Sequence, residues 1–144
     1  MTRLGLYAII IVAGLASQTL RADAPPLCPI GNAVMNGTYV MSGTGTILGT
    51  GGGPLTFLGA VTYNGDGTGT VTSLSQNVIG SVGRATSIPA SFTVNRDCTG
   101  SKIVGAGPTA QHFDFVITPD GKTITFIGTD GFAVLSGTAV RMNR

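Results

Sequence analysis

The sequence contains no glutamate and no tryptophan, and charged residues make up only 10% of its 144 residues. The few charges nearly balance, with eight lysines and arginines against six acidic residues, all of them aspartate. Basic residues do not cluster between aromatic ones, so the usual footprint of a nucleic-acid-binding protein is missing. A basic amphipathic helix that could bind a membrane surface is also missing. Composition therefore predicts neither nucleic acid nor a membrane surface as a partner.

Strong helix formers are scarce, whereas β-branched residues are plentiful and glycine occurs 23 times. Such a composition favours strands over helices. Apolar residues alternate with polar ones over short runs, as in strands with one buried face, and this pattern argues against a disordered chain. We therefore predict an all-β protein with a single hydrophobic core.

The first residues have the pattern of a secretory signal peptide. Arg3 precedes an apolar run over residues 4–16, and small residues follow up to Ala24. The run is too short to span a bilayer, which needs about 20 apolar residues. We predict that residues 1–24 are removed after Ala24 and that the mature protein is secreted or periplasmic, with no membrane span. A cut after Ala16 and an uncleaved membrane anchor are the alternatives.

The best-patterned stretch covers residues 112–128, where two alternating runs flank a Pro-Asp-Gly-Lys turn. This arrangement predicts a β-hairpin. Because side chains alternate along a strand, Phe113 and Phe115 fall on one face and His112 and Asp114 on the other. The aromatic face is predicted to be buried. We interpret His112 and Asp114 as surface residues and not as an acid/base pair.

Three aspartates, Asp66, Asp97 and Asp120, each follow a pair of alternating apolar residues and precede glycine or a short stretch that contains glycine. An aspartate in this position caps its own turn, and glycine supplies the positive φ. The unequal intervals between them indicate repeated hairpins in a meander, not a solenoid of fixed period. The loop 64–69 resembles the first half of a calcium loop but has Ser75 where such a loop needs glutamate. We predict turn capping, no metal and no cofactor.

Eight strands joined by short connections predict an up-and-down antiparallel barrel, with a two-sheet β-sandwich as the alternative. Pro89 indicates a bulge or an edge in the fourth strand. The predicted strands cover residues 37–48, 54–63, 68–75, 84–94, 101–105, 111–118, 123–128 and 132–142.

In such a meander the three aspartate turns lie at one end of the barrel, with the start of the first strand. Cys28 precedes that strand and Cys98 lies in the second aspartate turn. The two cysteines of an exported chain are most simply paired, so we predict a Cys28–Cys98 disulfide. It would fix residues 25–36 across this end of a barrel domain spanning residues 37–144. A catalytic Cys98 is disfavoured because no base lies nearby.

An eight-stranded barrel is just wide enough to be filled by side chains or to hold one small ligand. Parity predicts the following inward residues: Leu55, Phe57, Val61, Tyr63, Phe92, Val94, Phe113, Phe115, Ile117, Ile124 and Phe126. Any gap should open away from the aspartate turns, near residues 49–53, 76–83, 106–110 and 129–131. If a ligand binds, we expect aromatic residues to line its site, namely Phe57, Tyr63, Phe92, Phe113, Phe115 and Phe126.

Four stretches carry a family resemblance: Asn36-Gly-Thr-Tyr39, Tyr63-Asn-Gly-Asp-Gly-Thr-Gly69, Phe92-Thr-Val-Asn-Arg-Asp-Cys-Thr-Gly100 and Ser136-Gly-Thr-Ala139. In these the chain resembles small exported Gly/Thr-rich bacterial β-proteins of uncharacterised function. Their fold is similar to calycin-type or allene-oxide-cyclase-like barrels. The resemblance implies a barrel but no catalytic residue, and the lipocalin Gly-x-Trp signature is absent.

The leading functional hypothesis is an exported, non-enzymatic binding or surface-interaction protein with an extracellular partner. The first alternative is a carrier of a small apolar molecule in the barrel interior, and the second is a barrel isomerase or cyclase. A carrier should show a dry pocket of about 300 Å³ or more. An interaction module should show a filled interior and an exposed patch, and an enzyme should have polar or titratable groups pointing inward.

Overall fold

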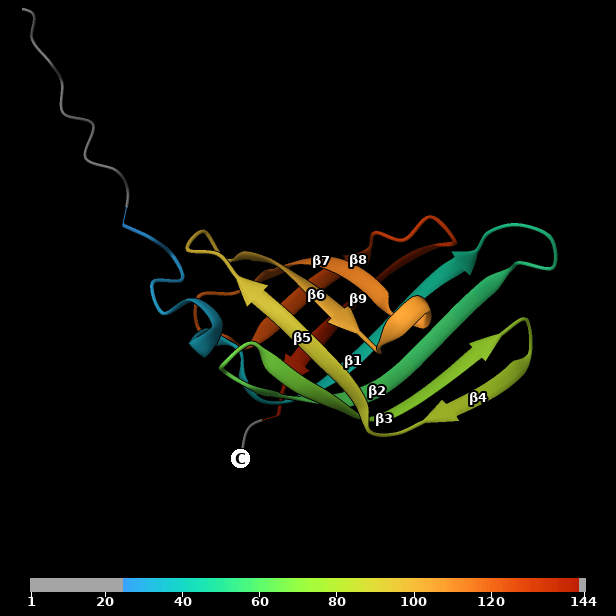
Figure 1. The fold of residues 1–144 in the computed structure, drawn as a ribbon, viewed down its shortest axis with the longest axis horizontal. Coiled ribbons are helices and arrows are strands. Elements are labelled where there is room, and N and C mark those ends of the chain that lie inside the picture. The colour runs from blue at the N-terminus through green and yellow to red at the C-terminus, as the bar shows by residue number, and fades with distance from the viewer. Residues whose placement is uncertain (1–24, 143–144) are drawn as a thin grey trace, which may run out of the picture.

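A computed structural model describes residues 25–142, so the predicted signal peptide, residues 1–24, lies outside the described part of the chain. That part is built almost entirely from strands (Figure 1). The elements in chain order are η1 (Gly31–Val34), β1 (Asn36–Ile47), β2 (Pro54–Asn64), β3 (Thr68–Val78), β4 (Ser81–Ala85), β5 (Ile88–Val94), β6 (Thr99–Val104), η2 (Gly107–Thr109), β7 (Gln111–Ile117), β8 (Thr123–Gly128) and β9 (Ala133–Arg141).

Eight of the strands close into an antiparallel barrel. Each pairs with the next in the order β1, β2, β3, β5, β6, β7, β8 and β9, and β9 pairs back with β1 to complete the ring. Closure gives every one of these strands a hydrogen-bonded neighbour on both sides, which removes the exposed edges that a sandwich would leave. The predicted barrel is confirmed, and the alternative β-sandwich is not the fold.

The predicted fourth strand, residues 84–94, is wrong, because this stretch forms parts of two strands. β4 and β5 are separated at Ser87, whose φ of 58° breaks the extended backbone. Before the break, β4 folds back on the far half of β3, so it lies outside the barrel ring as an extra strand (Figure 1). A bulge makes this possible, since the β2–β3 register shifts at Ala60 and Val61. Beyond it, β3 changes its second partner from β5 to β4.

The three aspartate turns lie together at one end of the barrel, on the left in Figure 1. The Oδ1 atoms of Asp66 and Asp97 each accept hydrogen bonds from the hydroxyl and the backbone N–H of the threonine two residues later. Asp120 accepts from the Thr118 hydroxyl at 2.6 Å and the Lys122 N–H at 3.1 Å. These hydrogen bonds lower the pKa of all three carboxyl groups. Each aspartate caps its turn, as the sequence predicts.

The segment before β1 crosses the same end of the barrel. The Cys28 backbone N–H donates to the Arg96 carbonyl at 2.9 Å, and the Asn32 side chain accepts from the Val94 N–H at 2.7 Å. The predicted disulfide is confirmed, because Cys28 and Cys98 are bonded with their Cα atoms 5.1 Å apart. Both cysteines are buried. This end of the barrel is therefore closed by the chain itself.

The predicted inward face is correct at every position, with Phe57 half-buried and the other residues of the set buried. Tyr39, which also points inward, packs edge to face against Tyr63, and Tyr63 against Phe92, with ring centroids 5.5 and 5.1 Å apart. The Tyr39 hydroxyl donates a buried hydrogen bond to the Gly121 carbonyl. These rings fill the closed half of the barrel.

Several glycines on the strands also point inward, and each pairs directly with an aromatic residue on the neighbouring strand. An added Cβ at any of these glycines would collide with the partner ring. The rings therefore lie across space that the glycines leave free, which allows several aromatic side chains to fit in a narrow barrel. The pairs are Gly43–Phe57, Gly69–Tyr63, Gly100–Phe115 and Gly137–Phe126.

The disulfide predicts the result of thiol titration. The unreduced, denatured protein should show no free thiol, because the sequence has two cysteines and both are in the disulfide. It closes a separation of 70 residues, so replacing both cysteines by serine should lower the free energy of unfolding by about 4 kcal/mol in the chain-entropy view. Two free thiols per chain in the unreduced protein would contradict the assignment.

The glycine–aromatic pairs predict that Gly100→Ala is destabilising although it adds only a methyl group. The methyl group would collide with the Phe115 ring and the Thr93 carbonyl, and overpacking of this kind costs about 1–3 kcal/mol. Gly131→Ala is the matched control, since no atom lies within 4 Å of its added Cβ. Urea unfolding of the two variants should separate them clearly. Equal stabilities would show that the ring does not need the glycine.

Candidate functional site

One charged side chain, that of Lys102, lies inside the barrel and is only 3% exposed. Its direction follows from strand pairing, because directly opposed residues of antiparallel strands share a face. Lys102 on β6 is opposite Phe92 on β5 and Phe113 on β7, and both rings point inward. The sequence analysis did not identify this residue.

The Lys102 amine is surrounded by aromatic rings. Nζ lies 3.9 Å from the centroid of the Phe126 ring and 5.0 Å from that of Phe113. The negative ring faces attract a cation and offset part of the cost of burying it. Burial lowers the pKa of the Lys102 ammonium group to about 7. The amine is therefore able to lose its proton near neutral pH.

No oxygen atom in residues 25–142 accepts a hydrogen bond from Nζ, and neither of the ion pairs there involves Lys102. Fully enclosed side-chain nitrogen and oxygen atoms in that part of the chain all have partners. Nζ therefore borders open space inside the barrel.

Two cavities adjoin each other between Lys102 and the loops at the open end. The inner cavity, of about 60 Å³, is lined by Lys102 and by mostly apolar side chains. The outer one, of about 100 Å³, continues toward the β8–β9 loop. Both fall below the size of about 300 Å³ set above for a carrier. The residues that line both are Leu55, Gln76, Gln111, Phe113 and Leu135.

The outer cavity ends at a polar pair on the rim. His112 Nδ1 lies 2.9 Å from Asp130 Oδ1, and the His112 backbone N–H donates to Asp130 Oδ2 at 2.7 Å. These hydrogen bonds lower the pKa of the Asp130 carboxyl group. The histidine is thus paired with a loop residue that the sequence analysis missed. Asp114 is exposed on the outer wall of the barrel, as predicted.

The structure divides the aromatic residues that we predicted to line a ligand site into two groups. Phe57, Phe113 and Phe126 surround the inner cavity. Tyr63 and Phe92 pack in the closed half, and Phe115 lies over Gly100. The cavity opens at the end farther from the aspartate turns, where the sequence places any gap.

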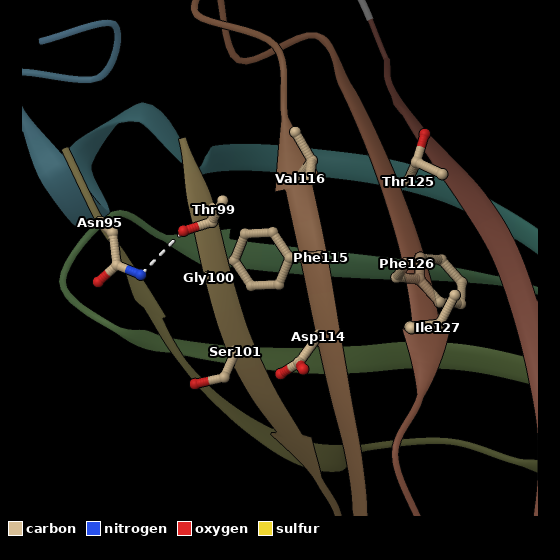
Figure 2. Close-up of a pocket in the computed structure, with 10 residues that line it drawn as sticks. All are labelled: Asn95, Thr99, Gly100, Ser101, Asp114, Phe115, Val116, Thr125, Phe126 and Ile127. Carbon is tan, nitrogen blue, oxygen red and sulfur yellow. Dashed lines mark hydrogen bonds between the residues drawn. The ribbon is translucent and has the colours of Figure 1, made fainter. Parts of the chain in front are cut away.

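A second hollow lies on the outer wall, across β6, β7 and β8 (Figure 2). This outer groove has a volume of about 540 Å³ and is bordered by small hydroxyl side chains, the Asp114 carboxylate and two aliphatic residues. The aliphatic residues are Val116 and Ile127, which are 56% and 54% exposed. Figure 2 shows Asn95 at one side, donating to the Thr99 hydroxyl at 3.0 Å. The groove is an open hollow on the outside of the barrel.

In the part of the chain that the structure describes, no three His, Cys, Asp or Glu residues gather where a metal ion could be held. No helix within residues 25–142 has the length and apolar character needed to cross a membrane. The interior amine is therefore the strongest candidate for a functional group.

Comparisons with known proteins give no match, whether to family models, to curated proteins or to solved structures.

The lowered pKa of Lys102 predicts how stability changes with pH. Between the folded pKa of about 7 and the ordinary value of 10.5, the unfolded chain binds a proton that the folded chain does not. The free energy of unfolding should therefore rise with pH in this window, by at most about 1.4 kcal/mol per pH unit. Below the folded pKa both states are protonated, and the full cost of burial remains.

Urea unfolding of the wild type and Lys102→Met between about pH 6 and about pH 9 isolates this effect. The wild type should gain stability relative to the variant as the pH rises. Burial raises the pKa of Tyr39 and of Tyr63, so neither should titrate in this range, and the His112–Asp130 pair is common to both proteins. Parallel curves would mean that Lys102 stays charged in the folded protein.

Proposed function

We propose that this chain is an exported binding protein that holds a small, largely apolar molecule inside the barrel, with an oxygen atom of that molecule against Lys102. The observation that carries the proposal is an amine inside the barrel that borders an apolar cavity and donates to no oxygen atom of residues 25–142. A buried polar group without a partner lowers stability. A titratable group with a strongly perturbed pKa inside a cavity is a candidate functional group. A ligand oxygen would supply the missing acceptor.

The dimensions of the cavities restrict the ligand. Pockets for drug-sized molecules start at about 300 Å³, whereas the inner and outer cavities have about 60 and 100 Å³. A dry cavity of about 150 Å³ can hold benzene. Neither cavity alone reaches that volume, so we expect a molecule about the size of benzene that extends through both, with its apolar part between Phe113, Leu135 and Leu55 and room for polar contact at Gln76 and Gln111.

Export is part of the proposal. The Cys28–Cys98 disulfide is compatible with an extracellular or periplasmic protein, because such bonds persist in oxidising compartments. The predicted signal peptide, residues 1–24, points to the same location.

The outer groove supports a second candidate, a surface-interaction protein. Val116 and Ile127 expose apolar surface there beside the Asp114 carboxylate. Isolated exposed aliphatic residues are common on monomers, so the groove is weaker support than the interior amine. An isomerase or cyclase would have the inward titratable group that we required of an enzyme. Lys102 is, however, the one titratable residue that lines the inner cavity, so no second titratable group is there to act with it.

Benzyl alcohol is a suitable probe, since it combines a benzene ring with one oxygen. It should raise the melting temperature of the wild type, because a ligand that binds only the folded state stabilises it. Leu74→Phe, which fills the inner cavity, should abolish the rise. Leu58→Phe is the matched control, because Leu58 lies on the outer wall and is exposed.

Lys102→Met should weaken the response to benzyl alcohol while keeping the response to toluene, which lacks the oxygen. If benzyl alcohol raises the melting temperature of Leu74→Phe as much as that of the wild type, it binds outside the barrel and the proposal is refuted.

Native mass spectrometry of protein from its own host would then be the direct test of the surface-interaction role. That role requires a retained macromolecular partner.

A further inference from the structure

The two lysines of the sequence lie in opposite surroundings. Lys102 is buried among rings in the barrel interior. Lys122 lies in the third aspartate turn at the closed end, exposed, with Nζ 3.4 Å from an Asp120 carboxylate oxygen. The interior favours the neutral form of Lys102, which has a free electron pair on nitrogen.

A neutral amine in an apolar cavity is a nucleophile. Lysines that are desolvated in hydrophobic pockets form Schiff bases with carbonyl compounds for this reason. Nζ borders the inner cavity and makes no hydrogen bond or ion pair within residues 25–142. Within those residues, no hydrogen-bond donor occupies the electron pair of the neutral amine.

A carboxylate ligand fits this cavity less well than a carbonyl compound. It would need the protonated amine, and a buried ion pair is favourable only where further hydrogen bonds satisfy the remaining oxygen atoms. Of the residues that line the inner cavity, only Gln76 and Gln111 carry side-chain amides, and both also line the outer cavity toward the mouth. A neutral carbonyl group enters the same space with a much smaller loss of hydration.

We propose that Lys102 captures a small aldehyde as a reversible imine inside the barrel. The amine nitrogen attacks the carbonyl carbon and forms a C–N bond, while the carbonyl π electrons move to oxygen, which takes up a proton as nitrogen loses one. Loss of the resulting hydroxyl group with a second nitrogen proton releases water and leaves a C=N bond. The step needs no oxidant or reductant, and the water can leave through the outer cavity.

This inference rests on the proposed function, because an aldehyde must first enter the cavity. It goes further by assigning a ligand class and a covalent bond to one atom, Lys102 Nζ. The Phe126 ring, 3.9 Å from Nζ at its centroid, would then lie beside the new C=N bond. If the imine nitrogen takes up a proton, this ring face would attract the resulting cation.

Reductive trapping tests the inference. The folded wild type is incubated with benzaldehyde and sodium cyanoborohydride near neutral pH, and peptide mass mapping locates the added benzyl group. Labelling at Lys102 should be at least tenfold faster than at Lys122, although Lys122 is far more exposed. Lys122→Met should label at Lys102 as the wild type does, and Lys102→Met should lose the fast reaction.

The controls separate this inference from the proposed function. Leu74→Phe should suppress labelling at Lys102 and leave labelling at Lys122 unchanged, whereas Leu58→Phe should alter neither. If benzyl alcohol still binds inside the barrel but Lys102 labels no faster than Lys122, the imine is refuted and the binding function stands. If benzyl alcohol fails to bind and Lys102 also fails to label, both are refuted. Fast labelling of Lys102 in urea-unfolded protein would likewise refute a role for the folded cavity.

Discussion

The barrel depends on a steric match between glycines and aromatic rings on neighbouring strands. Eight strands enclose a space that side chains barely fit, and several aromatic rings point into it. Phe57, Phe115 and Phe126 fit because each lies across an inward glycine of the next strand. Glycine in a strand is normally unfavourable. Here its missing side chain provides the volume that the rings need.

The same match determines where the interior amine can lie. Phe126 covers Gly137 on β9, and its ring is also the closest to Lys102 Nζ. The Phe126 ring thus contacts Gly137 and also lies next to the Lys102 amine. Toward the open end, the residues that line the barrel interior are no longer buried aromatic rings. They are half-buried residues such as Leu135 and exposed amides such as Gln76. The cavity begins where close packing of rings ends.

Alternation and turn chemistry predict most of this fold from the sequence. The hairpins, the inward face, the disulfide and the barrel all follow from local patterns of apolar residues, aspartates and glycines. The separate strand β4 does not, because it depends on a bulge and on Ser87 in a conformation that its residue type does not favour. A local pattern cannot show that β3 changes its partner halfway along its length.

Lys102 was missed for a related reason. Its neighbour Ile103 is the apolar residue, so alternation within β6 alone would place the lysine outside, whereas Ile103 is the exposed one. The hairpin register contains the missing information. Aligning β5 and β6 across the Asp97 turn sets Lys102 opposite Phe92, and directly paired residues share a face. The Asp130 partner of His112 was not predictable in this way, because a loop supplies it.

The segment before β1 crosses one end of the barrel and closes it. Cys28 and η1 cover the closed end, whereas the outer cavity is lined by residues near the β8–β9 loop, so we expect a ligand to enter and leave at that end. In the binding mode proposed above, a ligand would enter with the atom that contacts Lys102 first and with its opposite end near Phe132. Substituents on the trailing end would reach solvent and be tolerated. The same substituents on the leading end would meet the rings of Phe57, Phe113 and Phe126, so the proposed function predicts that the barrel discriminates between isomers that differ only in where their bulk is attached.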